Sequence, residues 1–202
     1  MPIDVSRLMK SRKQERLGLF GGSFDPPHLA HLIIAECARE QLGLERVIFI
    51  PAHQSPHKNG ATLTAADHRV EMTALAIEGN SSFEVSDIEV RRKGISYTVD
   101  TLKHFRDSFP QSDLYFIVGS DSLDQFESWK SPEEILSLVT LAVFPRRWGV
   151  EAKNKTTVVL HAPVIEISST DIRRRVKMGR SIRYMVPPKV EKFIQLHRLY
   201  SK

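Results

Sequence analysis

Cysteine is almost absent from this chain, since Cys37 is the single one among 202 residues. One thiol can form neither an internal disulfide nor a cysteine-based zinc cluster. Long hydrophobic runs are missing too. No apolar run approaches the roughly 20 residues that span a bilayer, and no apolar signal segment follows the basic N-terminus. A reducing cytoplasm is therefore the expected location, and no membrane partner is expected.

A strong charge imbalance is also lacking beyond the first 16 residues. The net charge is +5, but residues 1–16 hold five basic and two acidic side chains, so the other 186 residues hold only +2. This is a weak signature of nucleic-acid binding, and we expect no nucleic-acid partner, although small anionic ligands fit. Residues 1–16 are expected to be a basic extension, for which disorder and an added contact both fit. Residues 17–202 are expected to form one domain.

Apolar runs alternate with helical periodicity along the chain. Strands are expected at 17–20, 47–50, 83–90, 114–118, 141–144 and 157–160. Helices are expected at 29–43, 68–77, 98–109, just after Pro132, 171–178 and 189–200. Thr64 and Asp67 have the spacing of a capping box before the second helix.

This alternation predicts an α/β fold: a Rossmann-like, doubly wound and mainly parallel sheet with helices on both faces. In such sheets ligands bind beyond the carboxyl ends of the strands, where the strand order reverses. The loops 21–28, 51–60 and 119–129 follow predicted strands and are rich in Gly, His, Asp and Trp. They are the candidate ligand-binding loops.

The first of these loops lies in 20-FGGSFDPPHLAH-31. Gly21 and Gly22 permit positive φ and close approach of a ligand to the backbone, and the helix that follows offers N–H groups to a phosphate. The segment matches neither the P-loop nor the dinucleotide fingerprint, and a tight turn explains the glycines equally well. His28 and His31, at i and i+3 near a helix start, favour phosphate binding because imidazole N–H groups can donate to phosphate oxygens.

A second anion-binding pattern is 168-SSTDIRRR-175, where hydroxyls at a helix N-terminus precede arginine by one turn. Taken alone, it fits an ordinary capped helix with solvated arginines better. Beside the first loop, it predicts the second half of a triphosphate site.

Together these segments resemble the nucleotidyltransferase superfamily, which has an HxGH-type and an ISSTxIR-type motif. Within it they are most similar to the bacterial nicotinate mononucleotide adenylyltransferases. Further matching segments are PAHQSPHK (51–58), DHRVEM (67–72), GISYTVDTL (94–102), VGSDSLDQFESW (118–129) and SIRYMVPPKVEKFI (181–194). The resemblance implies that residues 17–202 form one nucleotidyltransferase domain.

The resemblance also implies a reaction. AMP passes from ATP to nicotinate mononucleotide by in-line attack without a covalent enzyme intermediate, giving deamido-NAD and pyrophosphate. Mg²⁺ is expected as cofactor through the ATP phosphates, with no metal ligand from the protein. The implied catalytic residues are His28, His31 and Arg173, with His28 as a transition-state donor. The implied ATP-binding residues are Gly21, Gly22, Ser23, Phe24, His28, His31, Ser168, Ser169, Thr170 and Arg173. The implied pyridine-nucleotide-binding residues are His57, Lys58, Tyr97, Thr98, Asp121 and Trp129.

Several interpretations stay open at this point. Trp129 could stack on a pyridine ring or be a core residue, and Asp121 could simply cap a turn. Ala30 replaces the glycine usual between the two histidines, and 145-PRRWGV-150 departs from the usual Arg-Pro-Gly turn. Alternative functions are adenylyl or cytidylyl transfer to another phosphate, such as phosphopantetheine, and a catalytically inactive nucleotide-sensing module. The sequence predicts no oligomeric state.

Overall fold

The computed structural model describes residues 14–56, 63–145 and 156–201. Its strands are β1 (Arg16–Gly22), β2 (Arg46–Pro51), β3 (Phe83–Val85), β4 (Asp113–Gly119), β5 (Thr140–Phe144) and β6 (Thr157–Val159). Its helices are α1 (Leu29–Leu42), α2 (Ala66–Ile77), α3 (Ile88–Arg92), α4 (Thr98–Ser108), α5 (Ser120–Asp124), η2 (Phe126–Ser128), α6 (Pro132–Leu138), α7 (Ser169–Lys177) and α8 (Pro188–Leu196). None of the helices in these ranges is long and apolar enough to cross a membrane.

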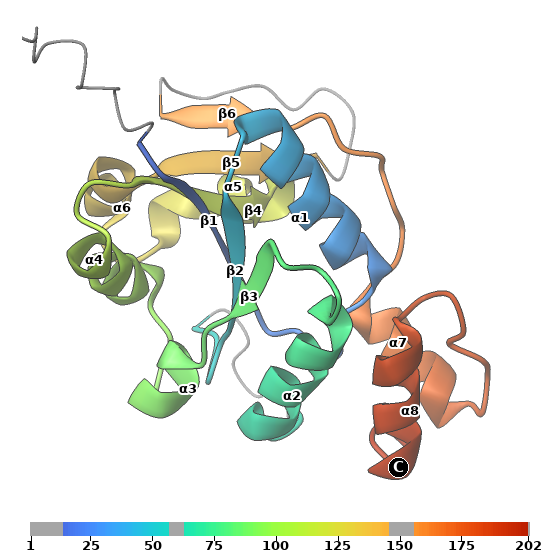
Figure 1. Ribbon diagram of the computed structural model, residues 1–202. Coiled ribbons are helices and arrows are strands. Elements are labelled where there is room, and N and C mark those ends of the chain that lie inside the picture. Colours follow the sequence, from blue (N-terminus) through green and yellow to red (C-terminus); the bar gives the residue numbers. More distant parts are fainter. Residues whose placement is uncertain (1–13, 57–62, 146–155, 202) are drawn as a thin grey trace, which may run out of the picture.

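The six strands form one sheet in the order β3-β2-β1-β4-β5-β6, and every neighbouring pair is parallel (Figure 1). The order reverses between β1 and β4, which are the first strands of the two halves. The predicted Rossmann-like doubly wound fold is confirmed, and the sheet is wholly parallel among the described strands. The fold therefore predicts a ligand site beyond the carboxyl ends of β1 and β4.

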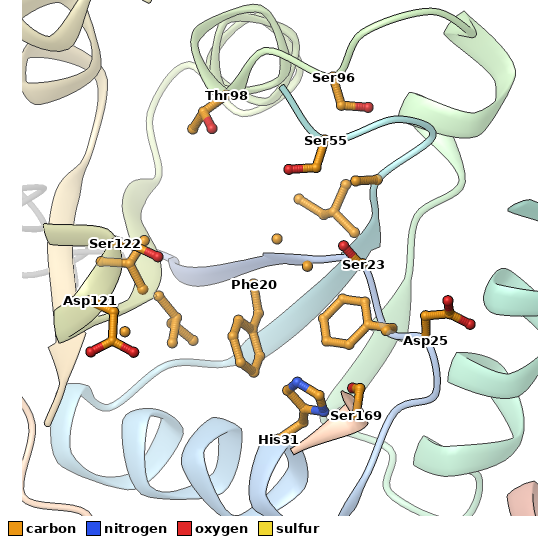
Figure 2. A pocket seen from close by; sticks show the side chains of 18 of the residues that line it. Phe20, Ser23, Asp25, His31, Ser55, Ser96, Thr98, Asp121, Ser122 and Ser169 are labelled. Carbon is orange, nitrogen blue, oxygen red and sulfur yellow. The ribbon is translucent and has the colours of Figure 1, made fainter. Parts of the chain in front are cut away.

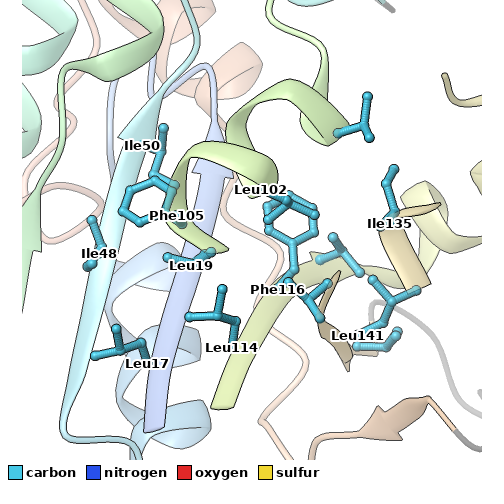
Figure 3. Close-up of a cluster of buried hydrophobic side chains, with 14 of the residues drawn as sticks. Leu17, Leu19, Ile48, Ile50, Leu102, Phe105, Leu114, Phe116, Ile135 and Leu141 are labelled. Carbon is cyan, nitrogen blue, oxygen red and sulfur yellow. The ribbon is translucent and has the colours of Figure 1, made fainter. Parts of the chain in front are cut away.

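Side chains alternate between two hydrophobic layers along each central strand, because successive strand residues point to opposite faces. On one face, Leu17 and Leu19 of β1 pack with Leu102 and Phe105 of α4 (Figure 3). On the other face, Phe20 packs with residues of α1 and α2. A third hydrophobic cluster joins α2 to α7 and α8, which lie together beside the sheet (Figure 1).

Two of the local predictions were wrong. The expected strand 83–90 ends at Val85 and is followed by the short helix α3, because alternating apolar residues also suit a single helical turn packed on a core. The capping box is absent: α2 has Ala65 as its N-cap, and the amide of Thr64 donates instead to Asp25 Oδ2 at 3.2 Å. That partner is 39 residues away in the sequence, where local spacing cannot reveal it.

The other predicted elements are present with shifted ends. Gly43 ends α1 with a φ of 61°, in the left-handed region where glycine has no steric penalty. The last helix, α8, stops at Leu196, four residues before the predicted end. At the N-terminus, Arg16 of the expected extension already belongs to β1, and residues 1–13 lie outside the described ranges.

Candidate active site

A cavity of about 450 Å³ opens beyond the carboxyl ends of β1, β4 and β5, where the strand order predicts a ligand site. Figure 2 shows His31 and Ser169 on one side of it and Ser55, Ser96 and Thr98 on the opposite side. Of the predicted site residues, it is lined by Gly21, Gly22, Ser23, Phe24, His28, His31, Thr98, Asp121, Trp129, Ser168, Ser169, Thr170 and Arg173. The fold thus brings both predicted half-sites to one cavity.

The glycines at the end of β1 lack the positive φ that glycine permits, while close approach of a ligand to their backbone stays a prediction. Neither Gly21 nor Gly22 has a positive φ; instead Phe24 adopts 46°, a conformation that costs energy for a bulky side chain. A Cβ on Gly22 would lie 2.9–3.1 Å from the ring of Phe24, and one on Gly21 would lie 3.3 Å from that of Phe116. Gly22 therefore provides the space into which Phe24 folds back.

Phe24 packs against His31, one of the predicted phosphate donors. Its ring is 2% exposed and meets the imidazole of His31 edge-on, with centroids 5.0 Å apart. Phe20 and Phe49 support it from the sheet at 5.6 Å each. The left-handed turn at Phe24 thereby places an apolar wall against His31.

His28 and His31 form a reciprocal pair at the start of α1. His28 is its N-cap residue, and its amide donates to Nδ1 of His31 at 3.1 Å. The two rings stack with centroids 3.7 Å apart. An acceptor nitrogen has no proton, so neutral His31 holds its proton on Nε2, the nitrogen that can donate to a phosphate oxygen. The predicted common face of the two histidines is confirmed.

The second motif lies directly against the first. Ser168 caps α7 by accepting from the amide of Asp171 at 3.1 Å. Ser169 Oγ donates to the carbonyl of Pro26 at 2.8 Å, and Arg173 donates to the carbonyl of Asp25 at 2.8 Å. Segments more than 140 residues apart in the sequence thus meet in one structure, with the N-terminus of α7 facing the same cavity as His28 and His31.

Most of the described residues predicted for the pyridine nucleotide also reach the cavity. Trp129 does so while packing against Phe116 and Phe126, with centroids 6.3 and 5.6 Å away, so it has the contacts of a core residue, and its stacking on a pyridine ring stays a prediction. Tyr97 does not line the cavity in the described part of the chain; it is the N-cap residue of α4, with Lys130 Nζ 4.5 Å above its ring. His57 and Lys58 lie outside the described residues.

Sequence reasoning missed Asp25, although it stands in the loop that was singled out. Asp25 is 2% exposed, and its carboxylate accepts from the hydroxyl of Tyr200 at 2.6 Å as well as from the Thr64 amide. Burial, together with the negative charge of Asp25, raises the pKa of Tyr200. Tyr200 therefore remains a neutral hydroxyl donor to Asp25. An Asp before two prolines suggests only a turn, so this contact has no signature in the sequence.

Glu89 was missed as well. It lines the cavity, is 7% exposed, and accepts from the hydroxyl of Thr101 at 2.6 Å, which in turn accepts from Arg92 at 2.9 Å. Burial raises the pKa of Glu89 despite these polar neighbours. Glu89 was missed because it stands in the segment 83–90, which was expected to be a strand, and this pattern does not predict a buried carboxyl group in the cavity wall.

The two departures from the motif pattern have different outcomes. Ala30 is 3% exposed within α1 and is not among the residues that line the cavity, so in the described chain its methyl group packs inside the protein. Of the segment 145–150, residues 146–150 lie outside the described ranges.

The described side chains offer few ligands for the Mg²⁺ that the resemblance implies. Within residues 14–56, 63–145 and 156–201 no three His, Cys, Asp or Glu side chains gather in a way that could hold a metal ion. The cavity does present oxygen donors, among them Asp121 and Ser122 (Figure 2), and Mg²⁺ prefers oxygen ligands and often binds through substrate phosphates. These residues fit an ion brought by ATP.

Comparison with known proteins shows the family to which the chain belongs. The family model described as cytidylyltransferase-like matches residues 19–175. A Salinibacter ruber protein named "probable nicotinate-nucleotide adenylyltransferase" is 47% identical over 189 residues, covering 91% of this chain and 97% of that protein. A protein of the same name from Thermus thermophilus is 47% identical over 186 residues, with 92% and 99% covered.

Solved structures show the same fold at lower sequence identity. Plasmodium falciparum nicotinic acid mononucleotide adenylyltransferase, complexed with NaAD, matches with a TM-score of 0.79 at 21% identity. The match covers 93% of this chain and 98% of that one. By its motifs, its fold and these relatives, the chain belongs to the cytidylyltransferase-like family of nucleotidyltransferases, together with the proteins named nicotinate-nucleotide adenylyltransferase.

Proposed function

We propose that this protein transfers the AMP moiety of ATP to nicotinate mononucleotide, releasing pyrophosphate and forming deamido-NAD. The observation that carries the proposal is the junction of two motifs: Ser169 and Arg173 of α7 bond to the loop that leads into His28 and His31. This junction brings Ser169 and Arg173 to the cavity that His28 and His31 line, where all four would donate to phosphate; Trp129 also lies in the cavity wall.

On the ATP side, the triphosphate would lie between the start of α1 and the N-terminus of α7. Helix N-termini favour anions through their N–H groups and dipole. Ser168, Ser169 and Thr170 would add hydroxyl donors, and Arg173 would pair with the β- and γ-phosphates. The glycine backbone at the end of β1, with Ser23 and Phe24, would line the nucleotide.

The chemistry needs alignment and charge stabilisation, with no nucleophile from the protein. The acceptor phosphate attacks the α-phosphate of ATP in line, the bond to the β-phosphate oxygen breaks, and pyrophosphate leaves. His28 would donate a hydrogen bond to the oxygens on which negative charge increases. Mg²⁺, bound to the ATP phosphates, would neutralise part of their charge. His28, His31 and Arg173 would hold the reacting group in place.

On the acceptor side, Trp129 would stack on the pyridine ring, and Thr98 would offer its hydroxyl at the start of α4. Asp121, which Figure 2 places on the remaining wall, would accept hydrogen bonds from the nucleotide. His57, Lys58 and Tyr97 stay predictions for this subsite. The reaction would take place in the cytoplasm, as expected from the single cysteine.

The test is pyrophosphate release from ATP and Mg²⁺ with three acceptors in parallel: nicotinate mononucleotide, nicotinamide mononucleotide and phosphopantetheine. We expect turnover with nicotinate mononucleotide and formation of deamido-NAD. Turnover with phosphopantetheine and with neither mononucleotide would contradict the proposal and support the alternative function, adenylyl transfer to phosphopantetheine. Nucleotide binding without turnover of any acceptor would indicate a sensing module.

A further inference from the structure

A buried arginine outside the cavity lining links the two loops that follow β1 and β2. Arg69 of α2 is 1% exposed. Its guanidinium group donates four hydrogen bonds of 2.5–3.0 Å, all to backbone carbonyl oxygens: those of Ser23, Ala52, His53 and Thr64. One side chain therefore holds three separate segments of backbone.

Burial of this charge has a cost that its contacts must offset. Desolvation lowers the pKa of Arg69, while the negative charges of Asp25 and Glu89 act in the opposite direction. An arginine remains protonated under these conditions, and its hydrogen bonds to carbonyls are charge-assisted. A lysine could not reproduce them, since its ammonium group has three donors on one atom, whereas Arg69 donates from three nitrogens in a plane.

The carbonyls that Arg69 binds belong to the loops that follow the neighbouring strands β1 and β2 and to Thr64 before α2; the amide of Ala52 also donates to the carbonyl of Gly22 at 2.9 Å. Ser23 follows Gly22 of β1, lines the cavity and belongs to the proposed ATP subsite. Ala52 and His53 begin the loop whose next residues include Ser55 in the cavity wall. The amide of His53 donates to Ser96 Oγ at 3.0 Å, which connects the same loop to the segment before Thr98.

We propose that Arg69 is a positioning residue that fixes the separation between the ATP subsite and the acceptor subsite. The inference rests on the proposed function, since it requires two substrates in one cavity. Each subsite has its own ligand contacts, so loosening this link leaves the separate affinities nearly intact. In-line transfer depends on the alignment of the two substrates, where a displacement of about 1 Å lowers the rate about 100-fold.

The chain offers a matched control in Arg106 of α4. Its guanidinium group also donates to backbone carbonyls, at 2.8 Å to Ser112 and 2.7 Å to Leu138. These residues precede β4 and β5, at the end of the sheet opposite the cavity. Loss of Arg106 therefore tests the structural effect of removing such an arginine without moving the substrates.

The experiment compares Arg69→Lys, Arg69→Met, Arg106→Lys and Arg106→Met in the full chain. Thermal unfolding gives the folded fraction of each variant, and pyrophosphate release is then measured where each is folded. We expect kcat to fall about 10-fold in Arg69→Lys and about 100-fold in Arg69→Met, with KM for ATP and for nicotinate mononucleotide within about 3-fold of wild type. The Arg106 variants should unfold at lower temperature with unchanged kcat.

Three outcomes would overturn the inference alone while the wild type is active. They are a folded Arg69→Lys with the wild-type kcat, an equal kcat loss per folded molecule at Arg106, and failure of Arg69→Lys to fold when Arg106→Lys folds. The last outcome would mean that Arg69 is needed for folding, so that a structural role alone explains its contacts. A wild type without turnover would overturn the proposed function and this inference with it.

Discussion

The amide of His28 donates a hydrogen bond to Nδ1 of His31, and the two rings stack 3.7 Å apart at the start of α1. Each histidine therefore sets the position of the other. In the proposed mechanism the pair would act as one preorganised donor unit, with the ring of Phe24 packed against His31. Such preorganisation places hydrogen-bond donors before charge develops on the substrate.

Replacement of His28 by alanine should remove the proposed transition-state donor. We expect kcat to fall by about 100-fold or more while the far-UV circular dichroism spectrum stays that of the wild type. Pyrophosphate release measures the first effect. His104→Ala on α4, outside the cavity lining, is the control and should keep full activity. Near-normal turnover in His28→Ala would reject the proposed mechanism.

Gly22→Ala should disturb the turn at Phe24. The new Cβ would lie 2.9–3.1 Å from the Phe24 ring, and overpacking of this kind costs about 1–3 kcal/mol of unfolding free energy. Gly21→Ala, whose Cβ would meet Phe116 at 3.3 Å, should cost less. Urea unfolding measures both. Adding Phe24→Leu to Gly22→Ala should recover stability, and an additive loss in that double variant would contradict the explanation.

Trp129→Ala should affect the two substrates unequally. The loss of a stacking surface should raise KM for the pyridine nucleotide far more than KM for ATP. Because Trp129 also packs against Phe116 and Phe126, the variant should unfold at lower temperature as well, and Trp129→Phe should lose less of both properties. Equal changes in the two KM values would remove Trp129 from the acceptor subsite.

Glu89→Gln should change how stability depends on pH. Burial raises the folded-state pKa of Glu89, against the opposing charges of Arg92 and Arg69. The stability contributed by the protonated group is therefore fully present below the ordinary carboxyl pKa, and is lost as the pH rises through the raised value. Glutamine cannot ionise and can still accept from Thr101. Relative to wild type, the variant's unfolding free energy should increase as the pH rises above the ordinary carboxyl pKa and through the raised value; a difference that stays constant with pH would refute this.

The sequence predicted the alternating elements because strands buried on both faces and amphipathic helices have distinct apolar patterns. Strand β4 and helix α4 match their expected ranges within one or two residues. The prediction of a strand over 83–90 was wrong because a helix as short as α3 has too few residues for its period to be distinguished from that of a strand. Capping at Thr64 failed because a distant carboxylate competes for its amide.

The site was predicted where it depends on residue type and missed where it depends on tertiary contacts. His28, Ser169 and Arg173 stand in recognisable motifs, and the fold brings them together. An arginine within a helical pattern is usually expected on the surface, so the pattern around Arg69 does not predict its burial, although Arg69 stands in the matching segment 67–72. The proposed positioning role of Arg69 depends on tertiary contacts, namely its hydrogen bonds to carbonyls of the loops that follow β1 and β2.

The bond between Tyr200 and Asp25 joins residues 175 positions apart. During synthesis, Asp25 is made long before Tyr200, so this contact cannot form until the residues between them have been translated. Contacts of such separation form late because a long loop must close first. The bond to the Asp25 carboxylate therefore forms only after Tyr200 has been synthesised, and a chain that stops before Tyr200 lacks this contact in the loop that leads to His28.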